Sequence, residues 1–202
     1  MKSPGNELFP QKKASKSEAR SRARGAWAAF LQQGPDASHR FLKNLHDLLL
    51  ARLQADSRIL ATLALADELD VMPILQEFPQ DVYVPRTQAE GRMDFHLYMR
   101  NRALLSPPEK GHHGVLGPSE GNEKLMLPAR RSDIIIIPSL AVNPRGYRLG
   151  RGGGYYDRKK NDLQKGFKLA LLPINPPLFD FQEETHDLRL DSVLTGEGIM
   201  EF

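Results

Sequence analysis

Four consecutive isoleucines, Ile134 to Ile137, stand between Asp133 and Pro138 and constrain the fold more than any other stretch. β-Branched residues favour an extended backbone, and a run without a polar position predicts a strand that is buried on both faces. Strands of that kind occur in largely parallel sheets whose two faces are covered by helices. The run therefore predicts an α/β fold.

Other segments predict strands and helices that alternate with this one. We expect further strands at residues 59–65, 82–84, 95–97, 168–172 and 192–195. We expect helices at residues 15–33, 38–55 and 68–78, where Ser15 or Ser17 caps the first and Gly34-Pro35 stops it. Residues 106–122 are rich in Pro, Gly and polar residues and predict a long surface loop. Together these segments predict a three-layer αβα sandwich with a largely parallel (mixed) sheet, Rossmann-like topology and an N-terminal helix.

The length of 202 residues fits one domain with its own core. Residues 1–14, with Pro4, Gly5 and Pro10, predict a flexible tail, and residues 15–202 the domain.

The chain has no cysteine, which excludes disulfides, thiolate metal sites and cysteine nucleophiles. The most apolar stretch, residues 59–66, is far shorter than the roughly 20 residues of a membrane-spanning helix. Without a signal-like apolar region or a heptad run, we expect a cytoplasmic monomer.

Positive charge is concentrated in two segments. The formal net charge is +3, yet residues 1–24 contribute +5 and residues 130–160 contribute +6, so the rest of the chain carries −8. Two focused basic segments suit a compact polyanion such as a nucleoside triphosphate. Neither zinc-finger spacing nor an RRM aromatic signature is present, so we do not expect nucleic acid as the partner. For residues 1–24, a basic helix face in contact with solvent is the alternative.

The segment that carries chemistry follows the isoleucine strand. Glycines occupy four of the five positions from Gly150 to Gly154, and Arg148 and Arg151 flank them. Glycine permits positive φ, and successive backbone N–H groups can bind an anion where a parallel strand ends. Asp157 is an oxygen ligand suited to Mg²⁺ beside phosphates. Walker A and Rossmann fingerprints both fail on spacing, and a mobile glycine turn is the alternative interpretation.

The run from Arg148 to Arg158, RLGRGGGYYDR, resembles the signature of the 5-formyltetrahydrofolate cyclo-ligase family, also called 5,10-methenyltetrahydrofolate synthetase. Weaker similarities extend over most of the chain. They comprise Lys16-Ser-Glu-Ala-Arg20, Ala66-Asp67-Glu68, Val84-Pro85-Arg86 followed by Met93, and Thr185-His186-Asp187 with the residues after it.

The resemblance implies an ATP- and Mg²⁺-dependent ligase that converts 5-formyltetrahydrofolate to 5,10-methenyltetrahydrofolate and releases ADP and phosphate. In that family the formyl oxygen attacks the γ-phosphorus of ATP, and N10 then captures the phosphorylated formyl intermediate. The attacking oxygen carries no proton, so this step needs positioning and charge stabilisation rather than a general base.

The resemblance also implies roles for individual residues. Arg148 and Lys16 would be catalytic. The ATP-binding residues would be Lys16, Arg20, Arg148, Gly150, Arg151, Gly152, Gly153, Gly154, Tyr155 and Tyr156. The folate-binding residues would be Leu63, Glu68, Met93, Arg151 and Tyr155. Asp157 and Asp187 would bind the metal.

Each assignment has a structural alternative. Lys16 and Arg20 can lie on a solvated helix face, and Glu68 can occupy the first turn of a helix. Met93 and at least one of Tyr155 and Tyr156 can pack in the core. For His186 we expect capping or core hydrogen bonding, and for His112-His113 no metal role.

Four positions depart from the usual family pattern. Val142-Asn143 replaces Phe-Asp, Val71 stands near a usual Thr, and Gly196 interrupts a Thr-Glu pair. The phosphate side of the pattern is therefore better kept than the folate side. A related ligase or kinase-like protein with another acceptor, or a non-catalytic nucleotide or RNA binder, is the alternative function.

Overall fold

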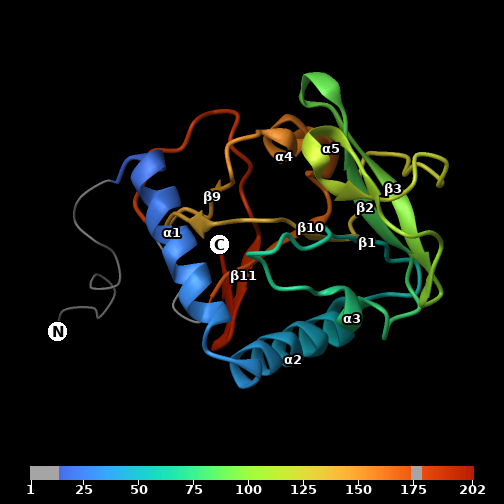
Figure 1. Cartoon of the computed structure of the whole chain (residues 1–202), viewed down its shortest axis with the longest axis horizontal. Helices are drawn as coiled ribbons and strands as arrows, with labels where there is room; N and C mark the ends of the chain where they lie inside the picture. Colours follow the sequence, from blue (N-terminus) through green and yellow to red (C-terminus); the bar gives the residue numbers. More distant parts are fainter. Residues whose placement is uncertain (1–13, 174–178) are drawn as a thin grey trace.

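The structure is a computed structural model that describes residues 14–173 and 179–202. An eight-stranded sheet lies at its centre, with the order β12-β11-β10-β7-β1-β2-β3-β4 (Figure 1). The strands are β1 (Ile59–Leu60), β2 (Val82–Thr87), β3 (Met93–Arg100), β4 (Ala103–Leu104), β7 (Ile134–Ile136), β10 (Phe167–Leu171), β11 (Ser192–Thr195) and β12 (Gly198–Glu201). The five strands from β11 to β2 are parallel, whereas β12, β3 and β4 join the edges antiparallel.

The isoleucine run behaves as predicted, because its side chains alternate between the two faces of the sheet. Ile134 and Ile136 pack in the core cluster that contains the buried side chains of α1 (Lys16–Leu31) and α2 (Pro35–Arg52). Ile135 and Ile137 pack on the opposite face, with Tyr156 of α4 (Tyr155–Arg158) and Leu163 of α5 (Lys160–Leu163). In Figure 1 the sheet accordingly lies between α2 below it and α4 and α5 above it. The three-layer, mostly parallel α/β prediction is confirmed.

The two long helices have clear sequence causes. Ser15 caps α1, because its hydroxyl accepts the backbone N–H of Glu18 at 3.2 Å. The buried side of α1 consists of Ala19, Ala23, Trp27 and Phe30. Helix α2 begins at Pro35, three residues before the predicted start, because Pro suits the first helical position and Gly34 takes a φ of +88°. The prediction that Gly34-Pro35 only ends the first helix was therefore incomplete.

The region from residue 61 to residue 78 differs most from expectation. Strand β1 has two residues instead of seven, and the predicted helix 68–78 shrinks to α3 (Met72–Leu75). Local side chain–backbone hydrogen bonds explain this: Glu68 accepts from the N–H of Leu65, and Asp70 from that of Met72. Glu68 consequently lies in a loop, and the first-turn alternative for it is wrong.

The remaining predictions differ mainly in their ends. Strands β2 and β3 are longer than predicted, β10 shifts by one residue, and β11 has the predicted bounds. The predicted loop 106–122 contains a hairpin of β5 (Glu109–Lys110) and β6 (Leu116–Gly117) around a 3₁₀ turn, η2 (His112–Gly114). Another small hairpin pairs β8 (Ala141–Val142) with β9 (Arg148–Leu149). Residues 1–13 of the predicted tail lie outside the described residues.

The strand order places a topological switch point between β1 and β7. From β1 the chain proceeds to β2 on one side, and it returns to β7 on the other side of β1. In open α/β sheets, ligands bind at such a point, beyond the carboxyl ends of the strands. Residues 61–65 after β1 and 137–140 after β7 therefore mark the expected site. Among the described residues, no helix is long and apolar enough to span a membrane.

Candidate active site

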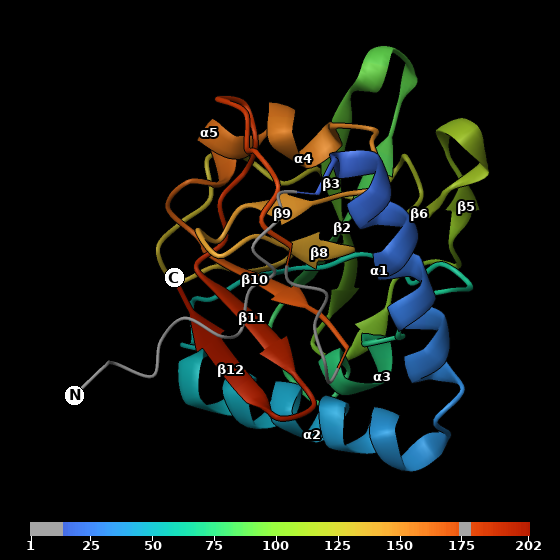
Figure 2. The same ribbon diagram turned by 90° about the vertical axis from the view of Figure 1, so that its left-hand side faces the viewer.

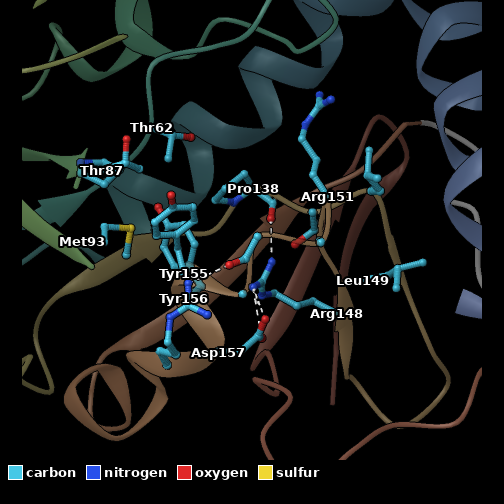
Figure 3. Close-up of a pocket in the computed structure, with 18 of the residues that line it drawn as sticks. Thr62, Thr87, Met93, Pro138, Arg148, Leu149, Arg151, Tyr155, Tyr156 and Asp157 are labelled. Carbon is cyan, nitrogen blue, oxygen red and sulfur yellow. Dashed lines mark hydrogen bonds and ion pairs between the residues drawn. The ribbon is translucent and has the colours of Figure 1, made fainter. Parts of the chain in front are cut away.

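A cavity of about 620 Å³ opens at the carboxyl ends of β1 and β7. All fifteen predicted site residues line it, although they come from α1, the loop after β1, β3, β9, the glycine turn, α4 and the segment around Asp187. Figure 3 shows Thr62, Thr87 and Met93 on one side of Tyr155 and Tyr156, and Arg148, Asp157 and Leu149 on the other. The fold thus gathers the predicted residues into one place.

Lys16 reaches the cavity from the first turn of α1. Its Nζ lies 2.8 Å from Oδ2 of Asp187 and 2.8 Å from Oε1 of Glu184. Burial alone would lower the pKa of Lys16, but the hydrogen bonds to these two carboxylates outweigh it and raise the pKa. Arg20, one turn further on, donates from Nε to the carbonyl of Gly150 at 3.0 Å. Lys16 is therefore a firmly charged, pocket-facing group, and the solvated-face alternative is wrong for it.

Arg148 forms the base of the cavity, and its side chain is 4% exposed. Its Nη1 donates to the carbonyl of Pro138 at 3.2 Å, and its Nη2 lies 3.1 Å from both carboxylate oxygens of Asp157 (Figure 3). The guanidinium carbon lies 5.4 Å from the ring centroid of Tyr156. Nε of Arg148 is buried and has no hydrogen-bond partner among the described residues. This arrangement fixes a positive charge against the cavity wall while leaving it incompletely satisfied.

Gly150 and Gly154 illustrate two different reasons for glycine in this turn. At Gly150 a Cβ would lie 2.5 Å from Nη1 of Arg148, so any side chain would displace the guanidinium. Gly154 has a φ of +66°, which other residues rarely adopt. The helix that follows, α4, is a single turn, and so few aligned peptide dipoles add little attraction for an anion. Side-chain cations and turn backbone, rather than a helix dipole, make this part of the cavity positive.

Arg151 and Glu68 meet on the predicted folate side. Nε and Nη2 of Arg151 lie 3.1 and 2.9 Å from Oε1 of Glu68, and Nη2 also lies 2.7 Å from Oδ1 of Asp67. The hydrogen bond from Arg151 holds the pKa of the Asp67 carboxyl below its usual value. Apolar surface beside these charges comes from Met93, Leu63 and Tyr155. A polar pair next to an apolar wall suits a flat heterocycle with hydrogen-bonding edges.

Tyr156 is mainly a core residue. It packs edge-on against Phe95, with ring centroids 6.2 Å apart, and burial raises the pKa of its hydroxyl. Within residues 14–173 and 179–202 this hydroxyl has no hydrogen-bond partner. This confirms that at least one of the two tyrosines packs in the core. Met93 is also buried, yet it lines the cavity, so core packing and pocket lining are compatible there.

The sequence analysis missed several cavity residues. Thr62, Thr87, Ser139, Glu184 and His186 also line the cavity. The side chain of His186 is 65% exposed and lies 3.3 Å from Glu184, so the capping or core role expected for it is wrong. Thr62 and Ser139 lie in the loops just beyond the parallel strands β1 and β7, which is a usable signal. Nothing in the sequence marks Glu184 except its closeness to Asp187.

The four departures from the family pattern lie away from the cavity lining. Asn143 is fully buried, and its amide donates to the carbonyl of Phe181 and the carboxylate of Glu183. Its Oδ1 accepts the N–H groups of Arg145 and Tyr147, just before Arg148. A carboxylate could not donate the first two bonds. The expectation that these changes weaken the folate side is therefore not supported by their positions.

The family profile described as 5-formyltetrahydrofolate cyclo-ligase matches residues 12–196. A mouse 5-formyltetrahydrofolate cyclo-ligase is 28% identical over 157 residues, which are 70% of this chain and 74% of that one. The Escherichia coli K12 relative is 31% identical over 102 residues, 48% of this chain and 53% of its own. The Mycolicibacterium smegmatis relative is 37% identical over 65 residues, so the match spans only 32% of this chain and 34% of that relative.

Solved structures agree on the fold. The Aquifex aeolicus 5,10-methenyltetrahydrofolate synthetase superposes with a TM-score of 0.72 at 21% identity, over 92% of each chain. The Mycoplasma pneumoniae 5,10-methenyltetrahydrofolate synthetase gives 0.66 at 16% identity, over 90% of this chain and 98% of its own. With the profile match covering most of the sequence, the chain belongs to the 5-formyltetrahydrofolate cyclo-ligase family.

Proposed function

We propose that this protein uses ATP to convert 5-formyltetrahydrofolate to 5,10-methenyltetrahydrofolate. One observation carries the proposal: in a single cavity, the two cations predicted to be catalytic are each paired with a predicted metal-binding carboxylate. Lys16 is paired with Asp187, and Arg148 with Asp157. A metal-bound triphosphate offers a matching set of charges, with oxygens for the cations and a cation for the carboxylates.

The donor set suits Mg²⁺ bound together with phosphate. Among the described residues, no three His, Cys, Asp or Glu side chains form a metal site by themselves. Mg²⁺ is commonly held by one or two carboxylates, with substrate phosphates and water completing the shell. We propose Asp157 and Asp187 as those carboxylates. When bound, Mg²⁺ would neutralise part of the charge on the phosphate oxygens.

Side chains and backbone of this chain would stabilise the negative charge of the phosphoryl group and position the two substrates. Lys16 and Arg148, released from their carboxylates, would contact phosphate oxygens, while the turn from Gly150 to Gly154 would lie along the triphosphate. The formyl oxygen needs no base, which fits a cavity where His186, the one histidine among the described lining residues, is largely exposed. Glu68, with Arg151 and the apolar wall, would orient the pterin so that the formyl oxygen faces the γ-phosphorus.

A spectroscopic assay tests the proposal. Mixed with 5-formyltetrahydrofolate, ATP and Mg²⁺, the protein is expected to produce the near-UV absorbance of the methenyl product, and to produce none when ATP is left out. Absence of that signal, with ATP still binding, would favour another acceptor. RNA affinity that falls steeply with salt would instead favour the nucleic-acid alternative.

We also propose a cytoplasmic monomer, which size-exclusion chromatography and cell fractionation would check.

A further inference from the structure

We propose that Arg158 is a positioning residue that clamps the tip of the β2–β3 hairpin, residues 88–92, to the glycine turn and to Tyr155. In this way it fixes the shape of the folate half of the cavity. The kinetic consequence rests on the proposed function, whereas the clamp itself does not.

One guanidinium joins three parts of the chain. Nε of Arg158 donates to the carbonyl of Gly91 at 3.0 Å, and Nη2 donates to the carbonyl of Gly153 at 2.7 Å. Its carbon lies 5.3 Å from the ring centroid of Tyr155. A planar guanidinium can fork between two carbonyls and stack on a ring at once, which a lysine ammonium cannot do.

The backbone is shaped to let this side chain pass. At Gly91, where φ is +69°, a Cβ would lie 2.3 Å from Nη2 of Arg158. At Gly154, where φ is +66°, a Cβ would lie 2.9 Å from Nη1. The guanidinium is thus bordered by a glycine with positive φ in each segment, Gly91 in the hairpin tip and Gly154 in the glycine turn. Alanine at either position would be strained and would also push against Arg158.

The clamped segments form walls of the cavity. The hairpin tip leads directly into Met93, and the glycine turn leads directly into Tyr155, and both residues line the cavity. Figures 1 and 2 show the tip of the hairpin and α4 on the same side of the sheet. A second, longer contact supports the clamp, because Nζ of Lys159 lies 3.9 Å from Asp94. Arg158 therefore couples the apolar wall around Met93 to the turn that carries Arg151.

Because Arg158 lies at the surface, its loss should affect folate binding more than the free energy of unfolding. Its hydrogen bonds lie at the exposed surface, where such contacts contribute little to the free energy of unfolding. Without the clamp, the hairpin tip and the Tyr155 ring become ordered only when folate binds. The entropy lost in this ordering weakens the binding of folate. Lys16 and Arg148 keep their own partners, so the rate of the bound complex should stay the same.

Kinetics on three variants test the proposal. Arg158→Ala should raise the KM for 5-formyltetrahydrofolate about tenfold with an unchanged kcat, which corresponds to about 1.4 kcal/mol. Arg158→Lys should give an intermediate KM, because lysine keeps the positive charge and hydrogen-bond donors but lacks the planar guanidinium that lies against the Tyr155 ring. Arg92→Ala is the matched control: Arg92 is an exposed arginine on the same tip, and its ion pair is with Glu90 at 3.7 Å. A KM for Arg158→Ala no higher than that of the control, or a loss in kcat alone, would overturn the proposal.

Hydrogen exchange provides a readout that needs no turnover. In Arg158→Ala, amides of residues 88–92 and 150–155 should exchange faster than in the wild type, and those of the core strand β7 should not. The Arg92→Ala control should leave residues 150–155 unchanged. If exchange at both clamped segments matches the wild type, the clamp does not exist. If the wild type fails to turn over folate but these exchange changes occur, the proposed function fails and the clamp stands.

Discussion

Two buried arginine–aspartate pairs lie at opposite ends of the parallel strands, and they differ in how completely they are satisfied. At the amino ends, Asp133 is fully buried and accepts from Nε and Nη2 of Arg58, and from the backbone N–H groups of Arg58 and Arg130. At the carboxyl ends, Asp157 is 19% exposed toward the cavity, and Nε of its partner Arg148 is unsatisfied within the part of the chain that the structure describes.

The difference separates a structural pair from a pair suited to ligand exchange. A buried ion pair stabilises a fold only when its remaining hydrogen-bonding capacity is filled, as it is around Asp133. The hydrogen bonds that Arg58 donates to Asp133 raise the pKa of Arg58, so its guanidinium stays charged. The pair at the cavity is held by fewer bonds and can be reached by a ligand. Arginine–aspartate chemistry alone therefore does not identify a site, whereas incomplete satisfaction beside a cavity does.

The largest expected effect is on stability. Asp133→Ala leaves the Arg58 charge and two backbone N–H groups without their partner, and it should lower the free energy of unfolding by about 3–5 kcal/mol. Urea unfolding followed by circular dichroism would measure it. A loss below about 1 kcal/mol would show that Asp133 is not a structural anchor.

The next effect is on turnover. Arg148→Ala should reduce kcat at least about tenfold, or about 1.4 kcal/mol of transition-state stabilisation. It should destabilise the fold less than Asp133→Ala does, because water can reach Asp157 through the cavity. Arg145→Ala is the control: Arg145 is paired with Asp180 and Glu183 outside the cavity lining, and its loss should leave kcat unchanged. Equal turnover in wild type and Arg148→Ala would remove Arg148 from the chemistry.

A smaller effect is expected on thermal stability when ATP and Mg²⁺ bind at the cavity. Mg²⁺ and ATP together should raise the thermal midpoint more than ATP alone, because only the complex supplies a cation for Asp157 and Asp187 when Lys16 and Arg148 leave them. Saturation at about 100 times Kd stabilises a protein by about 2.7 kcal/mol. Differential scanning fluorimetry with ATP, Mg²⁺ and both would show this. Identical shifts with and without Mg²⁺ would argue against the paired exchange.

The smallest effect concerns pH and the contact of α1 with the cavity. The hydrogen bond from Lys16 lowers the pKa of Glu184 below its usual 4.5. A carboxyl with a lowered pKa in the folded protein contributes stability above its unfolded pKa and loses it as pH falls through the folded value. Glu184→Gln should therefore be slightly less stable than wild type at pH 7 and equally stable at low pH. A difference that persists at pH 2 would have another cause.

Lys16 sets the pH at which this stability is lost on the alkaline side. Because its folded pKa is raised, the stability from its ion pairs is not weakened by lysine deprotonation below the usual lysine pKa of 10.5, and it is lost as pH rises through the folded value. As pH rises from 7, the free energies of unfolding of wild type and Lys16→Met should thus converge only when the pH becomes strongly alkaline. Convergence already near pH 8 would contradict the raised pKa.

Sequence reasoning succeeded where one interaction dominates. The isoleucine run could only be a doubly buried strand, and the spacing of glycines, arginines and Asp157 located the cavity. It failed between residues 61 and 78, where side chains of Glu68 and Asp70 compete for backbone N–H groups and shorten both strand and helix. The partners of Lys16 were also hidden, since Glu184 lies 168 positions away in the sequence. Such pairings depend on the tertiary fold, and no local pattern encodes them.

A crystal structure with Mg²⁺ and a non-hydrolysable ATP analogue tests the central claim most directly. We predict that phosphate oxygens contact Lys16 and Arg148, that Asp157 and Asp187 turn to the metal, and that the pair of Arg58 and Asp133 stays as it is. A nucleotide bound elsewhere, with Lys16 still on Asp187 and the glycine turn in contact with solvent, would contradict the account.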